Sequence, residues 1–100
     1  MKLGILVTTD RHFDDVIGLA RAAAAKGHEV RIFNMDAGTK LLENPGFTSL
    51  SKIPGISMSF CGHSAKHHDV NQDGIPPDIN CGSQYNNAVM MHDCQKVINL

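Results

Sequence analysis

The sequence has no excess of charge of either sign. Nine lysines and arginines stand against ten aspartates and glutamates, which leaves a formal net charge of −1. Proteins that bind nucleic acid usually carry a broad basic face, because they have to neutralise a phosphate backbone. We therefore expect no nucleic-acid partner for this chain.

Long apolar runs are also missing. The stretch from Met1 to Asp10 has one lysine, and its apolar segment is too short for the core of a signal peptide or for a membrane span. We therefore expect a cytoplasmic protein without a membrane partner. One hundred residues are enough for a single core, so we expect one domain over residues 1–100.

Two motifs that would identify other kinds of α/β protein are absent. A dinucleotide-binding fold has the pattern G-x-G-x-x-G after its first strand, but residues 8–13 read TTDRHF. Residues 61–64 read CGHS and hold only the first cysteine of the thioredoxin-like motif C-x-x-C. We therefore expect no cofactor and no dithiol exchange within this motif.

Cysteine is scarce, and its spacing is irregular. The three cysteines are an odd number, which excludes a disulfide framework as the main source of stability. In a reducing compartment all three would remain thiols. At least one cysteine is then available for chemistry.

Alternating strand and helix patterns predict an α/β fold. The apolar run Leu3–Thr8 predicts a buried strand, and the apolar positions from Phe13 onward have helical spacing up to a stop at Lys26-Gly27. A second strand at His28–Phe33 completes the spacing of a right-handed crossover between parallel strands. The later predicted elements are a short helix at Lys40–Glu43 that the sequence NPG interrupts, a strand at Ile56–Phe60, a loop at Asp69–Asn80, a helix that Ser83 caps and a strand at Lys96–Leu100.

Cys61 is the strongest candidate for a functional residue. It follows the apolar run Ile56–Phe60 and opens the segment CGHSAKHH. A thiol between a strand end and a helix start lies where backbone N–H groups and nearby cations favour the thiolate. The carboxyl edge of a parallel sheet is also where ligands bind. This position indicates either nucleophilic or metal-binding chemistry.

The chain resembles the DsrE/DsrF-like family of small sulfur-relay proteins over essentially its whole length. The matching features are a first strand into Thr8-Thr9-Asp10, the helix and strand LARAAAAKGHEV, Cys61 at a strand end with Ser64-Ala65 behind it, Gly82-Ser83 at the start of the last helix and a terminal strand after Asp93. The resemblance implies a three-layer sandwich with a mainly parallel four- or five-stranded sheet and helices on both faces. It also implies assembly into a homotrimer or homohexamer.

In active members of this family, a cysteine in the Cys61 position carries a persulfide from a sulfur donor protein to an acceptor protein. A carrier of this kind needs an exposed thiolate with a lowered pKa. The backbone N–H groups of Gly62, His63 and Ser64 would favour the thiolate, and Gly62 would allow a close approach. Lys66 or a protonated His63 would add positive charge. Some members of the family lack the cysteine and serve as structural subunits.

Two alternatives to a sulfur carrier remain open. Cys61, His63 and His67 form a thiol and imidazole set that suits zinc or copper, because the histidines are four residues apart. A non-catalytic assembly subunit is the other alternative. Cys81 precedes Gly82-Ser83 and is a candidate second thiol, although we favour packing for it. We expect a structural role for Cys94.

Overall fold

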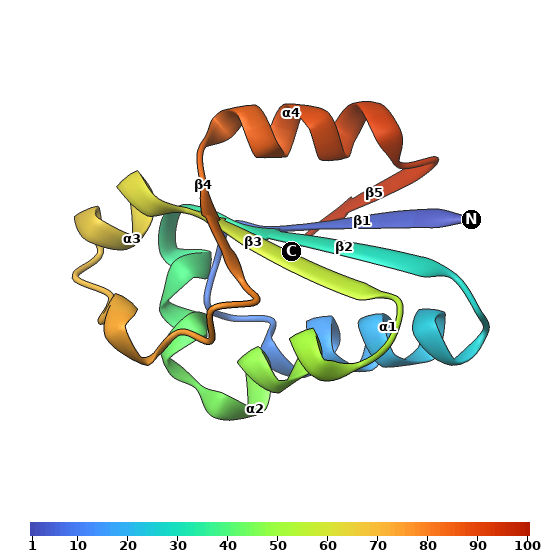
Figure 1. The fold of residues 1–100 in the computed structure, drawn as a ribbon, viewed down its shortest axis with the longest axis horizontal. Coiled ribbons are helices and arrows are strands. Elements are labelled where there is room, and N and C mark those ends of the chain that lie inside the picture. The colour runs from blue at the N-terminus through green and yellow to red at the C-terminus, as the bar shows by residue number, and fades with distance from the viewer.

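The computed structural model describes residues 1–100, which form one five-stranded parallel sheet between helices (Figure 1). The strand order is β4-β3-β2-β1-β5, and each neighbouring pair is parallel. The strands are β1 (Lys2–Val7), β2 (Glu29–Asn34), β3 (Ile56–Cys61), β4 (Asn80–Gly82) and β5 (Lys96–Asn99). The sheet and the helices on its two faces confirm the predicted α/β sandwich.

Helices cover the two faces of the sheet unequally. In Figure 1, α1 and α2 lie on one face, α4 lies alone on the other, and α3 lies beyond the carboxyl end of β3. The helices are α1 (Phe13–Ala25), α2 (Pro45–Thr48), α3 (Gly62–His67) and α4 (Gln84–Asp93), with 3₁₀ helices η1 (Asp36–Glu43), η2 (Ser49–Lys52) and η3 (Gln72–Gly74). None of these helices has the length and apolar character that crossing a membrane requires.

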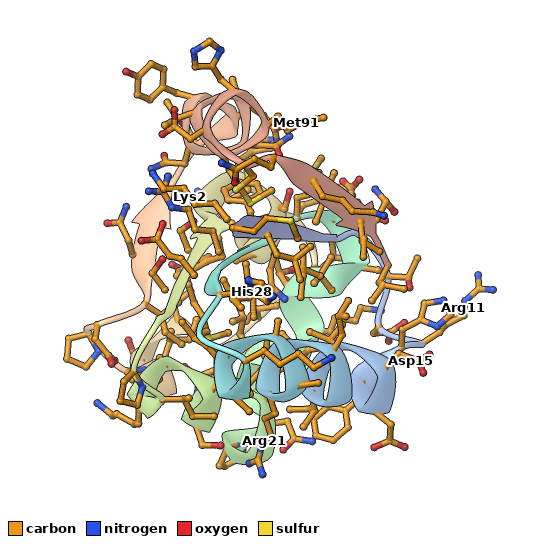
Figure 2. All side chains as sticks on the ribbon, turned by 90° about the vertical axis from the view of Figure 1, so that its right-hand side faces the viewer. Lys2, Arg11, Asp15, Arg21, His28 and Met91 are labelled. Carbon is orange, nitrogen blue, oxygen red and sulfur yellow. The ribbon has the colours of Figure 1, made fainter.

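The main core lies between the sheet and α1. Alternate residues of a strand point to opposite faces, and on this face β1 presents Ile5 and Val7 while β2 presents Ile32. The helix contributes Val16 and Ala20, four residues apart and both fully buried. Figure 2 looks toward the amino ends of the strands and shows α4 at the top and α1 at the bottom of the molecule.

The segment between β2 and β3 is more helical than its sequence predicts. The predicted helix at Lys40–Glu43 is the second half of η1. The sequence NPG at residues 44–46 does end this helix, as predicted, but it also starts another one, α2. The side chain of Asn44 accepts a hydrogen bond from the Gly46 N–H over 2.8 Å, and Pro45 occupies the first turn of α2.

The predicted loop Asp69–Asn80 ends in a strand that the sequence pattern does not predict. β4 has only three residues and pairs with Ser59–Cys61 at the end of β3. Asn80 and Cys81 are both exposed, so β4 lacks the apolar pattern that identifies a strand in a sequence. β4 belongs to the sheet only because it pairs with β3.

A second, smaller core lies between the sheet and α4. Phe33 and Cys61 from the sheet contact Met90 of α4 and Cys94 behind it. Met90 is the buried residue of α4, whereas Tyr85 is exposed on its outward face. This outward face also includes Ala88, Val89 and His92, and all of them are exposed.

Candidate functional site

Cys61 ends β3 and also caps the helix that follows. Its backbone is extended, with φ −81° and ψ 112°, and its Sγ accepts a hydrogen bond from the Ser64 N–H over 3.5 Å. This is the geometry of a helix N-cap, in which a side chain satisfies a free backbone donor of the first turn. The predicted junction between a strand end and a helix start is therefore present at Cys61.

The Cys61 thiol is less accessible than a sulfur carrier requires. Only 5% of the residue is exposed, because its side chain leaves the sheet on the face that α4 covers. It lies in the small core with Phe33 and Met90. The expectation of an exposed thiol is therefore wrong for a single chain in this conformation.

Hydrogen bonds lower the pKa of the Cys61 thiol. Burial raises this pKa, since it disfavours the charged thiolate. The side chain and backbone of Ser64, the backbone of His63 and the side chain of Gln84 act in the opposite direction, and the pKa falls below its ordinary value. The thiol is thus buried and still predisposed to ionise.

The predicted supporting residues divide into two groups. Ser64 is buried beside the thiol, and both its side chain and its backbone lower the thiol pKa. The backbone of His63 acts in the same direction. The side chains of His63 and Lys66 are exposed, and hydrogen bonds rather than cationic side chains lower the thiol pKa. Gly62 is the first residue of α3 and lies against Cys81.

Gln84 is a site residue that the sequence reasoning missed. It begins α4, and its amide lies between the Cys61 thiol and the Met35 sulfur, to which its Nε2 donates over 3.7 Å. One feature of the sequence pointed toward Gln84: it directly follows Ser83, the predicted cap of a helix that starts at the same sheet edge as Cys61. Identifying Gln84 also required the position of β4 beside β3, which the sequence pattern did not predict.

The alternative metal ligands do not converge. No group of three His, Cys, Asp or Glu side chains comes together in an arrangement that could hold a metal ion. Cys61 is buried under α4, whereas His63 and His67 are exposed. The His67 ring instead meets the His68 ring edge-on, with 5.2 Å between the ring centroids.

The other two cysteines have opposite environments. Cys81 is exposed, so the packing that we favoured for it is wrong; β4 is an edge strand, and no strand lies beyond it. Its Sγ lies over Gly62, where an added Cβ would be 2.8 Å from this sulfur. Cys94 is buried, and burial raises its thiol pKa, which fits the structural role expected for it.

A groove lies on the α4 face of the sheet, the face from which the Cys61 side chain also leaves β3. Its volume is about 420 Å³, and it lies between α4 and the strands β2, β3 and β4. Ser57 and Ser59 form part of its floor, on the same face of β3 as Cys61. The side chains of Arg31, Asn80, Tyr85 and Val89 also line it.

Comparisons with solved structures support the fold. The crystal structure of the ychN protein from E. coli covers 100% of both chains with a TM-score of 0.70 and 13% identity. Protein of unknown function MTH1491 from Methanobacterium thermoautotrophicum has a TM-score of 0.77 at 11% identity, over 99% of this chain and 98% of its own. No protein-family model matches the chain, and no curated protein matches it. Both neighbours have the DsrE-like fold, and at these identities the likeness concerns the fold alone.

Proposed function

We propose that this protein is a sulfur carrier that holds a persulfide on Cys61 and passes the outer sulfur to a partner protein. The observation that carries the proposal is the Cys61 thiol itself. It caps a helix at the carboxyl edge of a parallel sheet, and its hydrogen bonds lower its pKa although it is buried. A core cysteine without such partners has a raised pKa, as Cys94 does.

The chemistry of the carrier consists of two exchanges at sulfur. The Cys61 thiolate attacks the outer sulfur of the donor's persulfide, a new S–S bond forms, and the donor leaves as a thiolate. An acceptor thiolate then attacks the outer sulfur on Cys61, which leaves as a thiolate in turn. A lowered pKa supplies the thiolate for the first step and improves the leaving group in the second.

We also propose that several copies assemble, as a homotrimer or a homohexamer. Tyr85 and Val89, one turn apart on α4, are 74% and 36% exposed, and both line the groove. Large apolar side chains grouped on one surface are typical of contact sites between proteins. A second copy that packs on α4 would cover this surface.

Burial of Cys61 favours one competing function, that of an assembly subunit without sulfur chemistry. The two functions differ in a direct experiment. The purified protein is incubated with glutathione persulfide, and its intact mass is measured in wild type and in Cys61→Ser. A carrier gains one sulfur atom that is lost in Cys61→Ser and retained in the matched control Cys94→Ala. An assembly subunit gains no sulfur at Cys61.

A further inference from the structure

Two side-chain amides of α4 are hydrogen-bonded to each other, and one of them contacts the proposed reactive thiol. Asn87 Nδ2 donates to Gln84 Oε1 over 3.3 Å. Gln84 Nε2 in turn donates to the sulfur of Met35 over 3.7 Å, and the Gln84 side chain also hydrogen-bonds the Cys61 thiol. Residues three apart on a helix are neighbours on its surface. A chain of contacts therefore runs from Asn87 through Gln84 to Cys61.

The orientation of the Gln84 amide decides what it offers to the thiol. An amide side chain has a donor end, the NH₂ group, and an acceptor end, the carbonyl oxygen. A thiolate accepts hydrogen bonds, so the Nε2 end stabilises it and the Oε1 end would repel it. In the structure Nε2 is directed at sulfur and Oε1 at Asn87. A donor that binds Oε1 therefore keeps the stabilising end of the amide on the sulfur side.

A purely structural role does not explain the Asn87 side chain. Its Oδ1 atom is buried and has no hydrogen-bond partner, so its one side-chain hydrogen bond is the bond to Gln84. A buried acceptor without a partner lowers the stability of a folded protein. An apolar side chain of similar shape would avoid this loss. The contribution that only an amide makes at this position is the Nδ2 donor to Gln84.

Neutral groups set the ionisation of Cys61. Burial and hydrogen bonds shift its pKa, and the other titratable group of the small core is Cys94, whose raised pKa keeps it neutral near pH 7. His63 and Lys66 of α3 are exposed, as is His92 near the end of α4. The support of a thiolate by neutral donors depends on how those donors are oriented.

We propose that Asn87 is a positioning residue of the sulfur carrier, whose Nδ2 group holds the Gln84 amide with Nε2 toward the Cys61 sulfur. The inference rests on the proposed function. The oriented amide would stabilise the Cys61 thiolate twice, as the nucleophile that attacks the donor and as the leaving group when the acceptor takes the sulfur. Asn87 acts on the thiol only through Gln84.

The test measures the rate of Cys61 alkylation by iodoacetamide as a function of pH, with peptide mapping to separate Cys61 from the other cysteines. The midpoint of this profile gives the thiol pKa, whereas its plateau at high pH depends on access to the buried thiol. In Asn87→Leu the midpoint should rise, and alkylation at neutral pH should slow by roughly threefold relative to the plateau. The unfolding free energy in urea should be no lower than that of wild type, because the unpaired acceptor is gone.

A double-mutant cycle separates positioning from a direct effect on the thiol. Gln84→Met keeps the length of the side chain and removes its amide, so the midpoint should rise at least as far as in Asn87→Leu. Adding Asn87→Leu to Gln84→Met should shift the midpoint no further, because the amide that Asn87 holds is gone. Gln72→Met removes an exposed amide from η3 and is the matched control with the wild-type midpoint.

A wild-type midpoint in Asn87→Leu would overturn the positioning role, and so would additive shifts in the double variant. Asn87→Ala, which only removes atoms, takes the place of Asn87→Leu if circular dichroism shows that the leucine variant is unfolded. Sulfur uptake from glutathione persulfide is measured separately by intact mass. If wild type takes up no sulfur at Cys61, the proposed function fails, and the alkylation profiles still decide whether Asn87 positions Gln84.

Discussion

The Sγ of Cys61 accepts a hydrogen bond from the backbone N–H of Ser64 over 3.5 Å, so a thiol occupies a helix position that an oxygen side chain usually fills. A thiolate is a stronger acceptor than a thiol, because it carries a full negative charge. The folded protein therefore favours ionisation of Cys61, even though the residue is buried.

Ser64→Ala should raise the pKa of the Cys61 thiol. The substitution removes the hydroxyl hydrogen bond but keeps the backbone N–H, so part of the stabilisation of the thiolate remains. Alkylation of Cys61 at neutral pH, followed by peptide mapping, should become slower. Ser57→Ala is the matched control, because Ser57 is exposed and lies on the same strand as Cys61. An unchanged rate in Ser64→Ala would contradict the role of this hydroxyl.

The pH dependence of stability should have opposite signs for Cys61 and Cys94. The pKa of Cys61 is lowered in the folded state, so its thiolate adds stability that is complete above the unfolded pKa and lost as the pH falls through the folded pKa. The difference in unfolding free energy between wild type and Cys61→Ser should therefore grow as the pH rises toward 9.0, the ordinary value of this thiol. For Cys94 the pKa is raised, and the corresponding difference against Cys94→Ser should shrink as the pH rises above that value. Urea titrations at several pH values measure both differences.

Gly38→Ala should destabilise the fold strongly, by about 3 kcal/mol. A Cβ at Gly38 would clash with the backbone carbonyl oxygen of Val7, which is buried at the end of β1 and also accepts the Met35 N–H over 2.9 Å. Gly18→Ala is the matched control, since nothing lies within 4 Å of a Cβ there and the residue is inside α1. That change should stabilise the protein by about 0.5–1 kcal/mol. Urea unfolding measures both changes. If the unfolding free energies of the two variants shifted in the same direction, the predicted clash at Gly38 would be refuted.

Charge on the outer face of α4 should dissociate the proposed assembly. Tyr85→Lys combined with Val89→Lys places two cations where two large apolar side chains are exposed one turn apart, and repulsion between copies opposes contact there. Light scattering at micromolar concentration should report a trimer or hexamer for wild type and a smaller species for the double variant. Lys96→Ala, on the edge strand β5, serves as a surface control. A monomeric wild type would reject the assembly.

Replacing both His63 and His67 by alanine should leave sulfur uptake intact. Both side chains are exposed, and hydrogen bonds from other groups lower the thiol pKa. Intact-mass measurement after incubation with glutathione persulfide should show uptake close to that of wild type. Equilibrium dialysis against zinc is the complementary measurement. One tightly bound zinc ion per wild-type chain, lost in the double variant, would instead favour the metal-binding alternative.

The sequence by itself determined the elements that have a strong local signal. These elements are the apolar run of β1, the helical spacing of α1 and the glycine stop after α1. Each depends on residues close by in the sequence, so it can be predicted without tertiary contacts. The junction at Cys61 belongs to the same class. An apolar strand followed by a small residue and a helix start sets the thiol at the carboxyl edge of the sheet.

Only the tertiary structure decided which thiol is accessible. Cys61 and Cys81 stand in similar sequence settings, each ahead of a glycine at a helix start, yet one is buried and the other exposed. The difference arises because Met90 of α4 packs against Cys61 at the end of β3, while β4 pairs at the edge with no strand beyond it. β4 carries no apolar pattern of its own, and Gln84 reaches Cys61 only because that pairing places the start of α4 beside β3. Burial depends on contacts between segments far apart in the chain, and local periodicity contains no information about them.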